Sequence, residues 1–311
     1  MKKLLEIVKD GLAGSVIKKL RYRNRRLLRA MHEKILATPP LGCNPAAPVE
    51  VHTLTAHHHL TMYLTAIKSL LRYHAQVAVV VHDDGSLDGQ DQDHLRRHVE
   101  GIRIIRRPAA DAEMNAILAP YPRARALRAR VVNALELFDN ILLARTDRLV
   151  NMNSDVLFLG EPRALVSWLE QNDGSIAGVY EETPAQQQDF LRAQGCPFPP
   201  HVTTALSCLY RDIHDLPFVE DVLARSTPDW FTAQNVYPLL FHRQDTTRHR
   251  PVRFFDQRAY QSSGVFPEGA VFRHYWTSTG WFTDLQARDS QQVMTELAET
   301  NGRGGAAACG S

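Results

Sequence analysis

Hydrophobic and polar positions alternate along the chain from about residue 50 in a way that predicts strands separated by helices. Residues 51–55 (VHTLT) are a short β-rich run, and residues 60–74 carry apolar side chains at helical spacing. Residues 76–81 (QVAVVV) form a continuous run rich in β-branched side chains. Such a run is typical of a strand that is buried on both faces, as in a parallel sheet.

The same alternation continues to about residue 210. In chain order, we expect a helix at 88–99, a strand at 101–106, a helix at 123–139, a strand within 149–159, a helix at 162–170 and strands at 175–179 and 205–210. Strands and helices in this order predict an α/β fold with a mostly parallel sheet flanked by helices. The ligand crevice of such a sheet lies at the carboxyl ends of its strands.

Composition is that of a folded globular protein, but the charge is uneven. The 311 residues are 44% hydrophobic and 23% charged, which excludes wholesale disorder. Of 36 basic and 34 acidic side chains, residues 1–35 carry 11 and 3, so this segment has a net charge of +8 and the remainder −6. Apolar runs such as residues 77–81 are far too short to span a bilayer.

The basic segment at 1–35 has apolar residues at roughly helical spacing, which predicts an amphipathic helix. It lies either on an anionic membrane surface or with its apolar stripe packed on the main domain. Unchanged co-sedimentation with membranes after deletion of this segment would exclude the first placement. Because it has few aromatic side chains that could stack on bases, we expect no nucleic acid partner.

A segment rich in proline and glycine follows the basic segment and predicts a linker. We therefore expect an extension and linker at 1–45, a main domain at 46–285, and a C-terminal helix with a flexible tail at 286–311. The basic segment has neither the continuous apolar stretch nor the cleavage site of a secretory signal. We expect a cytoplasmic protein, held at the inner membrane face if the basic segment binds lipid.

A first polar cluster, HDDGSLD at 82–88, directly follows the apolar run 76–81. Two adjacent carboxylates, Asp83 and Asp84, and a glycine at a strand end suit the recognition of ribose hydroxyls, of a base N–H or of a metal. The alternative is turn chemistry, with Asp-Gly forming a turn and Asp88 capping the next helix. Both interpretations remain open at this point.

A second polar cluster, Asn153-Ser154-Asp155, interrupts an apolar run. Burying a carboxylate there is costly unless something compensates its charge. A divalent cation that carries a diphosphate would do so, because Mg²⁺ and Mn²⁺ favour oxygen ligands. The alternative is an aspartate that caps a local turn. A third cluster, RHYW at 273–276, contains one of 14 histidines, and an isolated histidine is more often structural than a ligand.

These motifs together resemble those of glycosyltransferases of the GT-A fold. HDDGSLD follows an apolar strand, NSDVLF comes about 70 residues later, and HY stands late in the chain. The stretch LFDNILLARTDRLVNMNSDVLFLGEP is similar to the segment that contains the Asp-x-Asp motif of these enzymes. TTALSCLYRDIHDLPFVEDVL and DWFTAQNVYPLLF resemble their acceptor-side strand and helices. The resemblance covers roughly residues 50–285.

The resemblance implies a GT-A (Rossmann-like) fold and an enzyme that moves a sugar from a nucleotide-diphosphate sugar, with a UDP-sugar favoured, to an acceptor hydroxyl. It implies Mn²⁺ or Mg²⁺ as cofactor. The acceptor would be a glycan, a lipid-linked molecule or a small molecule, as in polysaccharide biosynthesis. A cation or an arginine would stabilise the charge that develops on the leaving nucleoside diphosphate.

The resemblance also assigns roles to individual residues. Asp155 and His274 would be the metal ligands. Asp229 would be the carboxylate base of an inverting enzyme, with a helix N-cap as the alternative role, and a retaining enzyme would need no such base. The nucleotide would be bound by Thr55, Ala56, Asp83, Asp84, Arg128, Asn153 and Ser154. For Arg128, a solvated helix face is the alternative to a diphosphate contact. Asn153 departs from the family, because the first aspartate of the motif usually stands there, and a neutral amide would hold a cation less tightly.

Other nucleotide-binding classes lack their signatures in this chain. Polar residues, among them His57, His58 and His59, follow the first strand where a nucleotidylyltransferase would have its glycine-rich loop. The GxGxxG of a dinucleotide-binding fold and the GxxxxGK[ST] of a P-loop are absent as well. Because of Asn153, one alternative stays open, namely a non-catalytic GT-A domain that binds a sugar nucleotide or a partner without turnover.

Overall fold

The computed structural model describes residues 26, 33–181, 185–196, 201–226, 232–262, 268–276 and 283–306. The chain divides into two compact units, one made of Pro40–His274 and the other of Met1–Pro39 with Tyr275–Ser311. Most of the predicted basic helix at 1–35 lies outside the described residues, as does Asp229.

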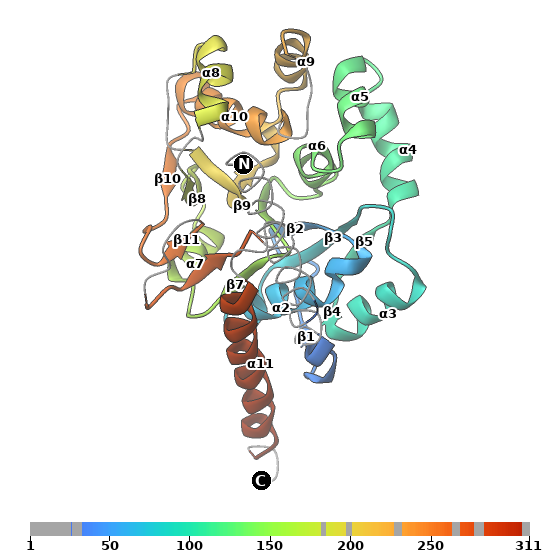
Figure 1. The fold of residues 1–311 in the computed structure, drawn as a ribbon, viewed down its shortest axis with the longest axis vertical. Coiled ribbons are helices and arrows are strands. Elements are labelled where there is room, and N and C mark those ends of the chain that lie inside the picture. Colours follow the sequence, from blue (N-terminus) through green and yellow to red (C-terminus); the bar gives the residue numbers. More distant parts are fainter. Residues whose placement is uncertain are drawn as a thin grey trace, which may run out of the picture. The chain divides into compact units, whose positions relative to one another are not determined.

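Helices and strands alternate along the described residues (Figure 1). The helices are η1 (Glu33–Ala37), η2 (His57–His59), α2 (Leu60–Leu71), α3 (Gly89–His98), α4 (Arg107–Ile117), α5 (Pro122–Arg130), α6 (Ala134–Leu142), α7 (Arg163–Glu170), α8 (Ala185–Ala193), η3 (Arg211–Ile213), α9 (Leu216–Ala224), α10 (Thr232–Arg248) and α11 (Thr283–Ala306). The strands are β1 (Leu41–Gly42), β2 (Val49–Thr55), β3 (Ala78–Asp83), β4 (Val99–Glu100), β5 (Arg103–Ile105), β6 (Arg148–Met152), β7 (Val156–Phe158), β8 (Ile176–Glu181), β9 (His201–Tyr210), β10 (Val252–Phe254), β11 (Tyr260–Gln261) and β12 (Phe272–His274).

The central sheet of the unit Pro40–His274 has seven strands in the order β10-β8-β9-β6-β2-β3-β5. β2 pairs in parallel with both β3 and β6, and β9 is antiparallel to its neighbours β6 and β8. Every residue of β3 is buried, as its continuous β-branched run predicts. The predicted α/β class with a mostly parallel sheet is therefore confirmed.

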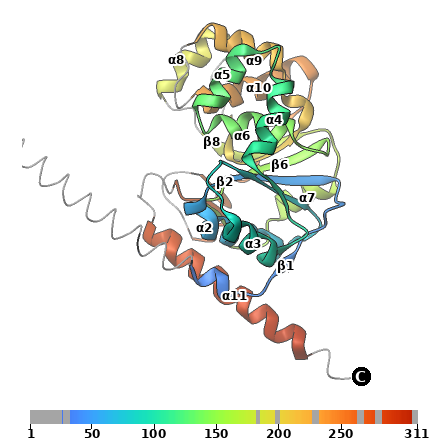
Figure 2. The same cartoon turned by 90° about the vertical axis from the view of Figure 1, so that its right-hand side faces the viewer.

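Helices cover both faces of this sheet. Figure 2 shows α2 and α3 on one side of the strands and α5 and α6 on the other. Helix α2 is buried at nearly every position, because its LTMYLTAIKSLL sequence is apolar around most of its circumference. Helix α6 packs against β2, and its Asn140 donates a hydrogen bond to Asn151 of β6 at 2.5 Å. Both faces of the central strands are therefore enclosed.

Two predicted elements are each divided in the structure. The helix expected at 123–139 forms α5 and α6, because the backbone at Val131 is extended (φ −120°, ψ 112°) where two β-branched valines meet. The strand expected within 149–159 forms β6 and β7, which belong to different sheets. β7 pairs with β12 in a three-stranded sheet of order β11-β12-β7, so the chain leaves the central sheet at residues 153–155.

A chain of buried polar side chains joins β2 to its neighbours. His52 contacts Glu50 (Nε2 to Oε2, 3.1 Å) and His82 (Nδ1 to Nε2, 2.8 Å), and Arg103 donates to Glu50 at 2.5 Å. Burial opposes ionisation of Glu50, but His52, the N–H of Arg145 and the charge of Arg103 together lower its pKa to about 2. Glu50 and Arg103 therefore form the charged pair, and burial keeps His52 neutral by lowering its pKa.

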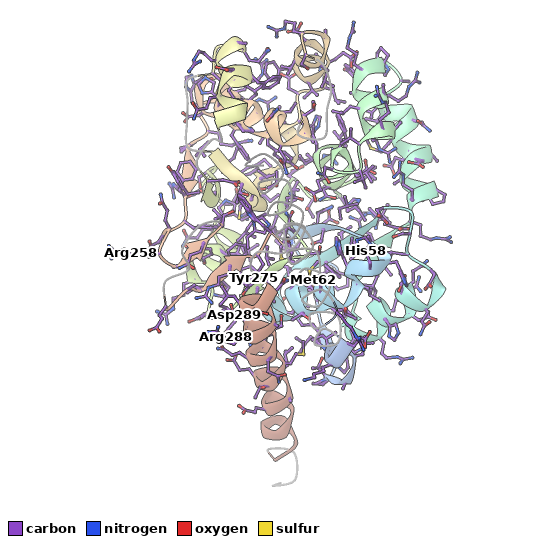
Figure 3. The ribbon with its side chains drawn as sticks, in the orientation of Figure 1. His58, Met62, Arg258, Tyr275, Arg288 and Asp289 are labelled. Atoms are coloured by element: carbon purple, nitrogen blue, oxygen red, sulfur yellow. The ribbon has the colours of Figure 1, made fainter. Side chains whose placement is uncertain are left out.

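The other unit contains α11 and η1. Tyr275 donates a hydrogen bond to Asp289 of α11 at 2.6 Å (Figure 3), and Lys34 of η1 contacts Gln291 at 3.3 Å. Within the described residues, no helix combines the length and the apolar character that crossing a membrane requires.

Candidate functional site

The carboxyl ends of three parallel strands bring several predicted site residues to one edge of the central sheet. Thr55 of β2 is the register partner of Asp83 of β3, and the N–H of Asp84 donates to the carbonyl of Thr55 at 3.2 Å. β6 is parallel to β2, with His52 and Asn151 as register partners. Asn153, which follows β6 in the chain, therefore lies at the same edge. This is the edge where the α/β topology predicts a ligand crevice.

Asp155 and His274, which stand far apart in the sequence, lie in contact. The Nε2 atom of His274 is 3.3 Å from Oδ1 of Asp155, and the two side chains are only 11% and 15% exposed. The antiparallel pairing of β7 with β12 places them together, because His274 is the register partner of Val156. The structure thus joins the two predicted metal ligands, and a carboxylate oxygen with an imidazole nitrogen can bind a divalent cation.

The orientation of His274 is supported from behind. Its Nδ1 atom is 3.3 Å from the hydroxyl of Ser262. If Nδ1 carries the proton and donates it to Ser262, the lone pair of Nε2 faces Asp155. A metal-binding histidine is usually held in this way, through a hydrogen bond from its other ring nitrogen. The arrangement therefore fits a histidine ligand.

Two further titratable residues interact with the charge of Asp155, and the sequence analysis assigned neither of them a role in the site. Burial and, after it, the charge of Asp155 raise the pKa of Glu136 on α6 to about 8. Burial and the neighbouring His58 lower the pKa of His59, whereas Asp155 and Asp84 act in the opposite direction. The available signal for Glu136 was a carboxylate in the otherwise apolar stretch ALELF.

We expect the Glu136→Gln variant to gain stability over the wild type as pH rises. The pKa of Glu136 is about 8 in the folded protein against an ordinary 4.5, so between these values the native state holds a proton that the unfolded state has lost. Wild-type stability therefore declines as pH rises through this window, and the neutral glutamine removes the decline. Urea unfolding of both proteins at pH 5 and pH 8 measures this. An equal stability difference at both pH values would contradict it.

The carboxylates of Asp83 and Asp84 stabilise a turn. Oδ1 of Asp83 accepts from the N–H groups of Gly85 (2.7 Å) and Leu87 (3.1 Å), and Oδ1 of Asp84 accepts from the N–H (2.9 Å) and hydroxyl (2.6 Å) of Ser86. Gly85 has φ +107°, a conformation that favours glycine. The turn alternative is thus realised, and contact of these aspartates with a nucleotide stays a prediction.

Arg128 is buried in a cluster of carboxylates. Its Nε and Nη2 donate to the two oxygens of Asp139 at 2.6 and 2.7 Å, and its Nη1 donates to Asp111 at 2.7 Å. The side chain is only 6% exposed, so a solvated helix face is not what the structure shows. A diphosphate would have to compete with these carboxylates, and the predicted contact of Arg128 with it stays a prediction.

The remaining predicted nucleotide-binding residues also lie at strand ends. Ala56 and Ser154 are buried, and Asn153 is half-buried. The N–H of Asn153 donates to the carbonyl of Ala205 at 3.0 Å, which ties the loop after β6 to β9. Their contacts with a nucleotide stay predictions.

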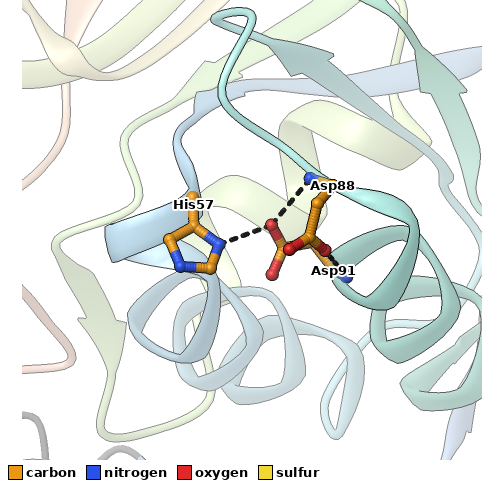
Figure 4. Close-up of side chains that lie close together, drawn as sticks. All are labelled: His57, Asp88 and Asp91. Atoms are coloured by element: carbon orange, nitrogen blue, oxygen red, sulfur yellow. Dashed lines mark hydrogen bonds and ion pairs between the residues drawn. The ribbon is translucent and has the colours of Figure 1, made fainter.

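A second histidine–carboxylate group lies at the start of α3 (Figure 4). The ligand-type atoms of His57, Asp88 and Asp91 lie within 4.8 Å of one another. Asp88 and Asp91 form a capping box for α3, and His57 Nδ1 is 2.7 Å from Oδ2 of Asp91. Helix capping accounts for the two aspartates of this cluster, and the predicted cap at Asp88 is confirmed.

No family model matches the chain, and no curated protein matches it by sequence. Solved structures do match. The bifunctional glycosyltransferase WbbM superposes with a TM-score of 0.50 at 12% identity over 83% of this chain and 53% of that one. The galactosyltransferase LgtC, in complex with donor and acceptor sugar analogues, has a TM-score of 0.48 at 13% identity over 78% and 95%. GlyE of Streptococcus pneumoniae TIGR4 has 0.48 at 11% over 81% and 63%.

The similarity to WbbM, of which this chain spans about half the length, concerns the fold. The chain has the fold of GT-A glycosyltransferases, as its motifs predicted.

Proposed function

We propose that the protein is a glycosyltransferase that moves a sugar from a nucleotide-diphosphate sugar, with a UDP-sugar favoured, to an acceptor hydroxyl. The observation that carries the proposal is the contact of Asp155 with His274 at 3.3 Å, at the edge where β2, β3 and β6 end. A fold does not determine an activity. The proposal therefore depends on this pair and on the polar residues that share its edge.

Asp155 and His274 would hold Mn²⁺ or Mg²⁺, with the amide oxygen of Asn153 as a further ligand. The cation would supply the positive charge that stabilises the leaving nucleoside diphosphate. Ser262 keeps the imidazole of His274 oriented. Asn153 lacks the charge of an aspartate, so Asp155 is the anionic ligand of the motif. We expect cation affinity to depend strongly on Asp155 for this reason.

The nucleoside would lie over the ends of β2 and β3. Thr55 and Ala56 would meet it through backbone groups, and Asp83 and Asp84 would contact the base and ribose through the oxygens that the turn leaves available. Ser154 would lie beside the diphosphate. For an inverting enzyme, Asp229 is the proposed base that takes the proton of the acceptor hydroxyl.

We expect UDP with Mn²⁺ to raise the melting temperature of the wild type, and neither UDP nor Mn²⁺ alone to do so to the same extent. A ligand at 100 times its Kd stabilises the native state by about 2.7 kcal/mol. A thermal-shift panel of UDP, GDP, dTDP and CMP, each with and without Mn²⁺, measures this. Asp155→Ala should abolish the shift, whereas Asp245→Ala, at an exposed position on α10, should keep it.

Each outcome of this panel has a consequence. A shift that ignores Mn²⁺ and survives in Asp155→Ala would contradict the metal site. No shift with any nucleotide would contradict the proposed function. A clear shift without consumption of sugar nucleotide, first by hydrolysis and then with acceptors, would favour the second candidate, a non-catalytic domain, which the neutral Asn153 supports.

The acceptor and the location of the enzyme are part of the same proposal. The net charge of +8 on residues 1–35 supports peripheral contact with an anionic membrane surface from the cytoplasmic side. A lipid-linked or surface-polysaccharide acceptor would suit that position.

A further inference from the structure

Arg107, the first residue of α4, joins the turn after β3 to the buried cluster around Arg128. Its Nη1 donates to the carbonyl of Asp84 at 3.3 Å, and its Nε donates to Oδ1 of Asp111 at 2.7 Å. The same Oδ1 accepts from Nη1 of Arg128 at 2.7 Å. One carboxylate oxygen thus connects the two guanidinium groups.

Beyond Arg128, this chain of charges reaches a helix that packs on the central sheet. Arg128 makes a two-point contact with Asp139 of α6, and both side chains are buried. The four groups, in order Arg107, Asp111, Arg128 and Asp139, alternate in sign, so their formal charges cancel. They come from α4, α5 and α6, and they tie these helices to one another and to the turn.

Arg107 meets the turn at three places. Besides the bond to the carbonyl of Asp84, its own N–H is 3.5 Å from Oδ2 of Asp83. Its aliphatic stem lies against Gly85, where the Cβ of any other residue would be 3.4 Å from Cγ of Arg107. Arg107 therefore restrains the backbone of the two aspartates that the proposed function places on the nucleoside.

We propose that Arg107 is a positioning residue of the nucleotide site. It holds the turn 83–86 in the conformation that binds the base and ribose, and Arg128 acts on the turn through Asp111 and Arg107 rather than by touching the diphosphate. This inference rests on the proposed function. Its physical basis is preorganisation, since a loop that is already ordered loses less entropy on binding. Without this role, the partly exposed ion pair Arg107–Asp111 would contribute almost nothing to stability or to binding.

The test compares UDP and GDP binding, each with Mn²⁺, by calorimetry for the wild type, Arg107→Met and Arg106→Met. Methionine keeps the packing against Gly85 and removes the guanidinium, and Arg106 is the exposed neighbour that serves as the matched control. We expect Arg107→Met to raise the Kd for UDP roughly tenfold, because the turn 83–86 must then be ordered when UDP binds. We also expect the ratio of the Kd values for GDP and UDP to move towards one. Arg106→Met should behave as wild type.

Binding of Mn²⁺ alone, followed by electron paramagnetic resonance, separates positioning from general damage. The polar contacts of Arg107 go to the turn and to Asp111, and not to Asp155 or His274. Mn²⁺ affinity should therefore be the same in Arg107→Met and wild type. If Arg107→Met does not fold, Asp111→Asn removes the negative charge that joins Arg107 to Arg128 and should weaken UDP binding in the same direction.

The failures are distinguishable. Wild-type UDP affinity and selectivity in both Arg107→Met and Asp111→Asn would overturn the positioning role while leaving the proposed function intact. Equal losses of UDP and Mn²⁺ binding would show a general structural effect and would also overturn it. Absence of nucleotide binding by the wild type would overturn the proposed function and this inference with it.

Discussion

Asp155→Asn is expected to lower the rate of sugar-nucleotide turnover by roughly 10²-fold or more. The substitution leaves the motif at 153–155 without a carboxylate, so the cation that would stabilise the leaving diphosphate loses its anionic ligand. Removal of one charge-stabilising group from an active site typically costs about 10²–10³ in kcat. Hydrolysis of UDP-sugars, measured by release of UDP with Mn²⁺ present, is the assay.

Two controls make this result specific to the site. Asp245→Asn, at an exposed position on α10, should keep full activity. Asp155→Asn should keep the fold, because asparagine has nearly the shape of aspartate and its amide can still contact Nε2 of His274. Conversely, Asn153→Asp should tighten Mn²⁺ binding by adding a second carboxylate. Full activity of Asp155→Asn would exclude the proposed metal site.

Arg128→Met is expected to lower the free energy of unfolding by about 3–5 kcal/mol, the usual cost of removing one partner of a buried ion pair. Asp139 is 2% exposed and would lose both of its hydrogen bonds from Arg128. The buried carboxylate of Asp139 then either stays charged without a partner or takes up a proton, and both lower the stability of the native state. Urea unfolding at pH 7 measures the loss.

The control for this prediction lies on the same helix. Arg125 is exposed on α5, so Arg125→Met should change stability by no more than about 0.5 kcal/mol. Arg128→Met combined with Asp139→Asn should lose less than the sum of the two single variants, because the uncompensated charge is gone. A loss below about 1 kcal/mol in Arg128→Met would show that water or another group compensates Asp139.

The sequence predicted the central elements well where one physical signal dominated. The β-branched run before His82 forms the buried strand β3, and Asp88 caps α3. The prediction from the sequence failed where two elements follow each other with no change in the pattern of polar and apolar residues between them. The single helix expected at 123–139 is two helices, because periodicity does not register an extended residue such as Val131 between them.

At the candidate site, motifs in the sequence identified candidate ligands such as Asp155 and His274, but not the residues that lie next to them in the structure. Glu136 was missed because a single carboxylate on an apolar helix gives no indication of what it faces. Arg128 was considered as a phosphate ligand or a solvated residue, and it is neither exposed nor without partners. Its carboxylates lie on α4 and α6, and helical spacing does not predict partners on other helices.

By itself, therefore, the sequence determined the α/β class, the buried strand and the ends of strands where polar residues gather, because these follow from local patterns of hydrophobicity and turn chemistry. Only the tertiary structure decided which of those residues meet. Asp155 and His274 come together because β7 leaves the central sheet and pairs with β12, and Arg107 reaches Arg128 because α4 and α5 present their charges to the same carboxylate. Both pairings join segments that are far apart in the sequence. Strand register determines the first and the compensation of buried charge the second, and neither can be read from a local pattern of residues.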